Sequence, residues 1–100
     1  MRAAVIGAGA SGMTAAITAA RLGHEVTLYE RQARAGRKLM ATGNGRCNLT
    51  NTGAAPSNYH GEAPAFVRPA LEGFGPAEAL DFFRGLGLLV REEHGGRVYP

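Results

Sequence analysis

The hydrophobic positions near the start of the chain form two short runs on either side of an alanine-rich stretch. Residues 3–6 are uniformly apolar, as expected of a strand that is buried on both faces of a parallel sheet. Residues 11–22 carry alanines at close helical spacing, and Gly23 follows directly as a helix stop. Residues 26–30 form a second strand-like run. The pattern therefore predicts a β–α–β unit of about thirty residues with two parallel strands.

In the second half of the chain, the spacing of the apolar residues predicts two helices. Residues 65–74 and 77–86 each place apolar side chains on one face, and Gly75-Pro76 separates the two stretches. Pro76 stands in the first turn of the second helix, where the missing N–H of a proline costs nothing. Four aromatic residues at helical spacing are expected to lie in the core, namely Phe66, Phe74, Phe82 and Phe83.

A short hairpin is expected at the end of the chain. Residues 88–90 and 97–99 are strand-like, and residues 92–96 between them are polar and contain glycine, which suits a turn. Glu92 and Glu93 are adjacent, so on a strand they would point to opposite faces and would make a poor general acid–base pair. The hairpin is therefore predicted as structure and not as a catalytic site.

Three glycines link the first predicted strand to the first predicted helix. Gly7, Gly9 and Gly12 stand in the G-x-G-x-x-G spacing of a turn that binds dinucleotides. Gly7 permits the tight turn, Gly9 lets the backbone approach a pyrophosphate, and Gly12 lets the helix lie close to the strand. The N–H groups of the first helical turn then face the phosphates. Because a strand precedes these glycines and a helix follows them, we expect a dinucleotide-binding turn.

Glu30 ends the second predicted strand, about 20 residues after the glycine turn. An acidic side chain at this place accepts hydrogen bonds from the ribose of an adenosine, and its charge repels a 2′-phosphate. The alternative is a glutamate that ends a strand in solvent, but the preceding glycine turn favours the ribose role. The predicted fold class is therefore α/β: a Rossmann-type βαβ segment, incomplete as a domain, followed by a basic loop rich in glycine and asparagine, two helices and a short β-hairpin.

A basic run follows the second strand. Residues 31–46 contain no acidic side chain and five basic ones: Arg31, Arg34, Arg37, Lys38 and Arg46. Residues 36–40 have the composition of a short helical turn, whereas residues 42–51 are too rich in glycine, asparagine and threonine for a regular element. Such a loop lines a polar ligand with backbone N–H groups and amide side chains. The alternative is a flexible surface loop whose charges are solvated.

The composition limits the class of protein. One hundred residues form one domain at most, and 45% hydrophobic with 19% charged residues is typical of a globular chain. The chain is short for an α/β sheet that is covered on both faces, so we expect residues 1–100 to be the N-terminal part of a longer protein. Residues 52–64 are expected to form a polar linker. The net charge of +3 does not by itself imply nucleic acid.

The sequence carries no signal for export, disulfides or metals. The first apolar run ends at Gly7, too early for a signal peptide, and no run approaches the ~18 apolar residues of a membrane span. A single cysteine, Cys47, excludes an internal disulfide and favours a cytoplasmic protein. Cys47 also lacks a second thiol for a redox pair, so packing against the core or a cofactor is its expected role. No ligand spacing connects the histidines, His24, His60 and His94.

Several stretches together carry a family resemblance. They are the glycine turn of residues 7–12, Glu30-Arg31, Gly36-Arg37-Lys38-Leu39, Thr42-Gly43-Asn44-Gly45-Arg46-Cys47-Asn48-Leu49-Thr50-Asn51 and Gly96-Arg97-Val98-Tyr99-Pro100. In these stretches the chain resembles the BaiN/RdsA-type NAD(P)/FAD-dependent oxidoreductases, also called aminoacetone oxidase family FAD-binding enzymes. The glycine turn is shared by many flavin and NAD proteins, whereas the block of residues 36–51 is far more particular. The resemblance extends over essentially the whole chain.

The resemblance implies the FAD-binding segment of a flavin-dependent oxidoreductase of glutathione-reductase-like architecture, in which a second domain interrupts the first. Electrons would pass between FAD and NAD(P)H or a small organic substrate, and no catalytic residue is assigned within these residues. The residues that the family pattern places around FAD are, at the pyrophosphate, Gly7, Gly9, Ala10, Ser11 and Gly12; at the ribose, Glu30; beside the adenosine and phosphates, Arg31 and Lys38; and near the flavin, Gly45, Arg46, Cys47 and Asn48.

Other functions stay open at this point. An NAD-binding dehydrogenase domain is compatible with Glu30, although the block of residues 36–51 argues against it. A nucleic-acid-binding module would use the cations of residues 31–46, but few aromatic residues accompany them. We therefore expect a small-molecule substrate, no nucleic acid and no membrane partner. It is also possible for so short a chain to fold poorly and to have no activity by itself.

Overall fold

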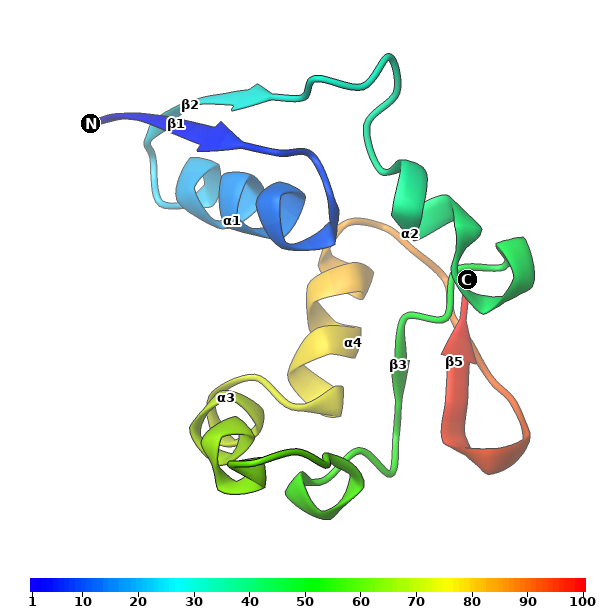
Figure 1. Cartoon of the computed structure of the whole chain (residues 1–100). Coiled ribbons are helices and arrows are strands. Elements are labelled where there is room, and N and C mark those ends of the chain that lie inside the picture. The colour runs from blue at the N-terminus through cyan, green and yellow to red at the C-terminus, as the bar shows by residue number, and fades with distance from the viewer. The chain divides into compact units, whose positions relative to one another are not determined.

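The computed structural model describes all residues of the chain, 1–100, and the chain packs as two compact units (Figure 1). The first unit comprises Met1–Gly45 and holds a two-stranded sheet, and the second comprises Arg46–Pro100 and holds a three-stranded sheet. The polar stretch of residues 52–64 lies inside the second unit. Neither unit contains a helix with the length and apolar character that spanning a bilayer demands.

The first unit is built on the predicted β–α–β pattern. β1 (Arg2–Ile6) and β2 (Glu25–Tyr29) pair in parallel over their full lengths, and α1 (Ala10–Arg21) connects them. Figure 1 shows α1 running along one face of the two strands. The alanine spacing allows this close packing, and Ala16 is the buried residue of the helix. The α/β class and the parallel strands that the sequence predicts are thus confirmed.

The two-stranded sheet is covered on one face. Val5, Val26 and Leu28 are half-buried, whereas Ile6 is 81% and Tyr29 is 55% exposed. Covered and exposed residues alternate along both strands because α1 packs on a single side. The expectation of a strand buried on both faces is therefore wrong for this structure.

A short helix ends the first unit. After β2 the chain runs without regular structure as far as α2 (Arg37–Ala41), and a single 3₁₀ turn, Gly43–Gly45, follows it. The predicted helical turn at residues 36–40 is confirmed within one residue at each end. This helix places its basic side chains near the glycine turn, as described below.

The second unit centres on an antiparallel sheet. Its strands are β3 (Thr50–Asn51), β4 (Arg91–Glu92) and β5 (Arg97–Tyr99), with β5 in the middle. Val98 and Tyr99 of the central strand are buried. A 3₁₀ turn joins β4 to β5, so the hairpin expected from the sequence is confirmed.

Two details of this sheet correct the sequence predictions. The strand expected at residues 88–90 is wrong, because pairing with β5 begins at Arg91 and residues 88–90 have no regular structure. The composition of residues 42–51 predicts no regular element, but Thr50 and Asn51 form β3. They pair with residues 97–98, almost fifty positions away, and local composition does not report such a partner.

Two helices connect β3 to β4. The first is α3 (Arg68–Gly73), which 3₁₀ turns at Pro56–Asn58 and Pro64–Val67 precede, and the second is α4 (Pro76–Gly85). The helix expected over residues 65–74 is thus confirmed only for Arg68–Gly73, because its first part is a 3₁₀ turn. An α-helix that began at residue 65 would need the Pro69 N–H as a donor to the Ala65 carbonyl, and proline has none, so Pro69 lies in the first turn of α3. The second helix begins at Pro76, as predicted.

The aromatic residues of this unit divide into two groups. Phe82 and Phe83 of α4 are half-buried and pack edge to face, with ring centroids 5.4 Å apart. Phe66 is 88% and Phe74 is 50% exposed, so the expectation that all four aromatic residues lie in the core is wrong for these two. Phe66 falls in the 3₁₀ turn, whose three-residue period moves it off the face assigned to it from the sequence.

Candidate cofactor site

The turn between β1 and α1 has the backbone geometry that its glycine spacing predicts. Gly7 has φ +96°, a conformation that L side chains rarely adopt, and its N–H donates to the Tyr29 carbonyl at 2.7 Å. A Cβ placed on Gly12 would lie 1.8 Å from the Gly7 carbonyl oxygen. Only glycine at position 12 therefore lets the first turn of α1 pass so close to the strand.

Gly9 leaves open space at the start of α1. A Cβ at this position would meet no atom within 4 Å, and its φ of −84° is open to any residue. Neither the backbone nor the packing thus requires glycine here, but a ligand against the backbone would. No side chain caps the helix, its first turn is free of acidic residues, and Ala10 and Ser11 are exposed. The opening fits the diphosphate of a dinucleotide.

Glu30 is tied to the glycine turn through its carboxylate. Its Oε1 accepts the Gln32 N–H and its Oε2 accepts the Ala8 N–H, both at 2.8 Å. The hydrogen bond from the Gln32 N–H, and next that from the Ala8 N–H, hold the pKa of the Glu30 carboxyl below its ordinary value of 4.5. The side chain is therefore ionised at neutral pH. Each carboxylate oxygen keeps a second lone pair, so ribose hydroxyls still find acceptors there.

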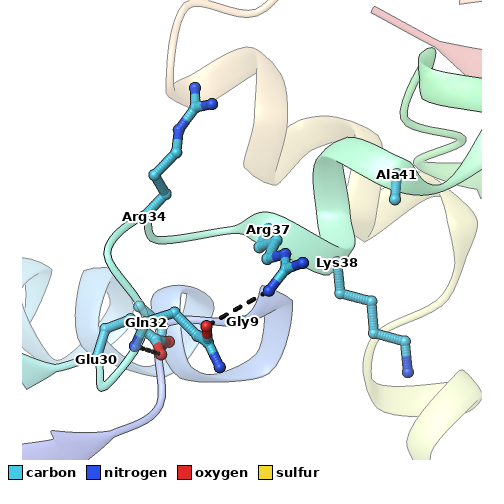
Figure 2. Close-up of a pocket in the computed structure, with 8 residues that line it drawn as sticks. Gly9, Glu30, Gln32, Arg34, Arg37, Lys38 and Ala41 are labelled. Carbon is cyan, nitrogen blue, oxygen red and sulfur yellow. Dashed lines mark hydrogen bonds between the residues drawn. The ribbon is translucent and has the colours of Figure 1, made fainter.

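A cavity of about 350 Å³ opens at the glycine turn (Figure 2). Three cations and one carboxylate are among the residues that line it: Ala8, Gly9, Glu30, Gln32, Arg34, Arg37, Lys38 and Ala41. They come from the turn, from the chain after β2 and from α2. The excess of positive charge suits a diphosphate, and the carboxylate suits a sugar that carries free hydroxyls.

One backbone hydrogen bond holds α2 beside the turn. The Gly36 N–H donates to the Ala8 carbonyl at 2.8 Å, and Gly36 is buried. A Cβ on Gly36 would come within 3.3 Å of the Met13 side chain on α1. This contact brings Arg37 and Lys38 to the cavity, although almost thirty residues separate them from the turn in sequence.

Some of the cofactor-binding residues predicted from the sequence line this cavity, and others lie elsewhere. Gly9, Glu30 and Lys38 line the cavity. Arg31 does not line it, but borders a neighbouring cavity of about 540 Å³ together with Ile6, Gly7, Tyr29 and Glu30. The adenosine side of the predicted site thus has two adjoining hollows, with Glu30 in the wall of both.

Five residues of the cavity carry no cofactor assignment from the sequence, and three of them have polar or charged side chains: Gln32, Arg34 and Arg37. Arg37 Nη1 lies 3.5 Å from Gln32 Oε1, and Figure 2 shows this pair beside Gly9. The basic run of residues 31–46 was the available signal for the two arginines. Gln32 gave no signal, because its place depends on the bond between its own N–H and Glu30.

In the second unit, Arg46 contacts the hairpin. Its Nη2 donates to Glu93 Oε1 at 2.5 Å, and its Cζ lies 4.0 Å from the centroid of the Tyr99 ring. The guanidinium is thus bound at one edge by a carboxylate and covered on one face by an aromatic ring.

The other residues predicted near the flavin have different surroundings. The Asn48 amide, oriented with its nitrogen toward the sheet, donates to the Thr50 carbonyl at 2.9 Å and to the Val98 carbonyl at 3.2 Å. Asn48 therefore anchors its loop to β5. Cys47 is a half-buried free thiol with a left-handed φ of 56°. Gly45 ends the 3₁₀ turn of the first unit. No three His, Cys, Asp or Glu side chains gather as a metal site would require.

The lowered pKa of Glu30 predicts a pH dependence of stability. Because the folded-state pKa lies below the ordinary value, the carboxylate stabilises the fold fully above pH 4.5 and loses its effect as the pH falls through the folded-state pKa. Glu30→Gln should therefore lower the melting temperature at about pH 7, and the difference between variant and wild type should shrink toward about pH 3. Thermal unfolding of both proteins between about pH 3 and pH 7 measures this difference in melting temperature. A difference that does not change with pH would contradict the lowered pKa of Glu30.

Comparison with known proteins gives one family and several relatives. The HI0933-like protein Rossmann domain matches residues 1–100. A 3-dehydro-bile acid delta(4,6)-reductase of Clostridium scindens is 48% identical over 101 residues, which cover 99% of this chain and 24% of that protein. Ribosomal RNA dihydrouridine synthases of Haemophilus influenzae and Escherichia coli are 33% and 34% identical over 95 residues, 95% of this chain and 24% of each relative. The chain spans about a quarter of the length of these relatives.

Proposed function

The chain belongs to the HI0933-like family of Rossmann domains, as the resemblance at residues 36–51 predicted, and from this premise we propose that it is the FAD-binding segment of a flavin-dependent reductase. The observation that carries the proposal is the open glycine turn with the ionised Glu30 beside it. A dinucleotide offers both groups that this arrangement takes, a diphosphate for the helix N-terminus and a ribose for the carboxylate.

The residues of the first unit would bind and orient the cofactor. The N–H groups of Ala10 and Ser11 at the start of α1 would hold the diphosphate, and Arg37 and Lys38 would offset its charge. Glu30 would hold the ribose and would exclude a 2′-phosphate, which argues against NADP at this site. When bound, FAD supplies the two-electron chemistry of its ring, which no side chain provides.

The block of residues 36–51 supports FAD over NAD as the resident cofactor. The family pattern that includes this block belongs to flavoproteins, and by that pattern Gly45, Arg46, Cys47 and Asn48 would lie near the flavin. NAD(P)H would then act as the electron donor and not as the resident cofactor. We place the protein in the cytoplasm, where a lone thiol stays reduced.

The relatives' names suggest one class of reaction. A delta(4,6)-reductase acts on the double bonds of a bile acid, and a dihydrouridine synthase forms dihydrouridine in ribosomal RNA. Both names describe the addition of two hydrogens to a carbon–carbon double bond. We propose the same class here: NAD(P)H and a proton together supply two hydrogens to a double bond conjugated with a carbonyl, and NAD(P)⁺ is formed. A small organic substrate is favoured, because the relative with 48% identity is named for one.

Reduction of uridine in RNA is the second candidate, and the two relatives with 33% and 34% identity favour it. The two candidates differ in product. A small-molecule reductase converts a free enone, whereas an RNA reductase leaves dihydrouridine in ribosomal RNA of cells that carry the gene and none in cells that lack it.

The proposal is tested on the full-length protein that carries this chain. It should purify yellow, release FAD on denaturation and oxidise NADH or NADPH when a conjugated enone is present, and the product should gain two hydrogens by mass spectrometry. A colourless protein that retains NAD would contradict the FAD assignment. A flavoprotein that reduces neither enones nor uridine would contradict the reaction class.

A further inference from the structure

The guanidinium of Arg46 is fixed on two sides within the second unit. Glu93 Oε1 accepts from Arg46 Nη2 at 2.5 Å, and the centroid of the Tyr99 ring lies 4.0 Å from Arg46 Cζ. Tyr99 is 9% exposed, whereas the Arg46 side chain is 49% exposed. The ring is therefore part of the core, and about half of the surface of the Arg46 side chain that rests on it is open to solvent.

The local charge is not balanced. Glu93 Oε1 also accepts from Arg91 Nη2 at 2.6 Å, so two guanidinium groups share one carboxylate. The hydrogen bonds from Arg46, and next from Arg91, hold the pKa of the Glu93 carboxyl below its ordinary value, so this carboxylate stays ionised near neutral pH. One positive charge is left over. A surface ion pair formed only to pin the loop would need one arginine, and such pairs contribute little stability.

Arg46 also has unused donors. A guanidinium carries five N–H groups, and within the chain its side chain donates to Glu93 alone. The adjacent backbone is fixed as well, because the Asn48 amide donates to carbonyls of β3 and β5. A donor that is already oriented loses little conformational freedom when it binds.

We propose that Arg46, oriented by Glu93 and Tyr99, binds an oxyanion through the N–H groups that Glu93 leaves unused. A guanidinium fork matches a carboxylate or a phosphate in paired hydrogen bonds, which a lysine does not. The source of the oxyanion rests on the proposed function: it is either a phosphate of the cofactor or an anionic group of the substrate. Arg46 is the binding residue, and Glu93 and Tyr99 position it.

The test compares charged ligands with uncharged counterparts in the full-length protein. FAD is compared with riboflavin, which has the same ring and no phosphate, by fluorescence titration of the apoprotein. A 3-oxo-4-ene steroid carboxylate is compared with its methyl ester by calorimetry. Arg46→Gln should weaken either FAD or the carboxylate by about 10- to 100-fold, the usual effect of losing hydrogen bonds to a charged group. Its effect on the uncharged counterpart should stay within about 2-fold.

Two further variants separate orientation from charge. Arg91→Gln removes the same charge from the same carboxylate, but no ring supports Arg91, so we expect less than about a 3-fold loss. Arg46→Lys keeps the charge and lacks the fork, so it should lose most of the affinity that Arg46→Gln loses. Thermal unfolding of all three variants identifies any that fail to fold, and Arg46→Lys is the replacement that perturbs the pair with Glu93 least.

The binding measurements test the role of Arg46 independently of the reaction that the protein catalyses. A loss confined to FAD assigns the oxyanion to the cofactor, and a loss confined to the steroid carboxylate assigns it to the substrate. Equal losses in Arg46→Gln and Arg91→Gln, wild-type affinity in Arg46→Lys, or unchanged binding of both charged ligands would overturn it. A protein that reduces no double bond would contradict the proposed reaction, while the binding comparison would still decide the role of Arg46.

Discussion

Gly12→Ala is expected to destabilise the β–α–β unit strongly, by about 3 kcal/mol. The new methyl carbon would lie 1.8 Å from the Gly7 carbonyl oxygen, and the atom it meets belongs to the backbone, which does not swing aside as a long side chain does. The start of α1 would have to move away from β1, and the N–H groups at the helix start would move with it. Thermal unfolding of the full-length protein and its FAD content on purification measure both effects.

Gly9→Ala is the matched control, because it adds the same methyl group three residues earlier. That carbon would meet no atom within 4 Å, so the melting temperature should stay close to that of the wild type. FAD affinity should nevertheless fall by at least about 10-fold, because the methyl group would occupy the space left for the diphosphate. A wild-type melting temperature in Gly12→Ala would contradict the close packing of the turn. Full FAD retention in Gly9→Ala would place the diphosphate elsewhere.

The glycine turn was predictable because everything that shapes it lies close in the sequence. A strand, three glycines and an alanine-rich helix occupy residues 3–22, and the geometry of the turn follows from steric limits on the backbone. Glu30 was predictable for a related reason, since a parallel βαβ unit brings the end of its second strand beside the end of its first. Local pattern and chain topology thus sufficed for this part of the site.

The rest of the site depends on contacts between residues that are far apart in the sequence, and the sequence pattern does not predict such contacts. Arg37 reaches the cavity because the Gly36 N–H binds the Ala8 carbonyl, a contact that no periodicity encodes. In the second unit, Thr50 and Asn51 form a strand because residues 97–98 offer backbone partners. Glu93 offers no such signal in the sequence either, because its carboxylate accepts from Arg91 and from Arg46, which lies 47 positions away.

The amphipathic pattern of the second half had a different weakness. It indicated which residues are apolar, but it did not reveal that the predicted helix is a 3₁₀ turn followed by α3, with Pro69 in the first turn of α3. A shift from a period of 3.6 to a period of 3 changes which side chains share a face. Phe66 therefore lies in solvent although its spacing suits a core position.

Glu30→Ala is expected to weaken FAD binding by about 10- to 100-fold. The carboxylate accepts the Ala8 and Gln32 N–H groups at 2.8 Å, and the proposed ribose would be held by the same oxygens. Its removal takes away the ribose acceptors and the tie between the glycine turn and the end of β2. Fluorescence titration of the apoprotein with FAD measures the loss.

A second ligand separates these two effects of Glu30→Ala. FMN lacks the adenosine, so its affinity should stay within about 2-fold of the wild-type value if Glu30 acts on the ribose. If the turn itself collapsed, FMN and FAD would weaken together. Glu25→Ala on the same strand is the matched control, because it removes an exposed carboxylate whose partner is Arg2, at 3.6 Å. It should leave FAD binding unchanged, and an equal loss in both variants would assign the effect to overall charge and not to the ribose.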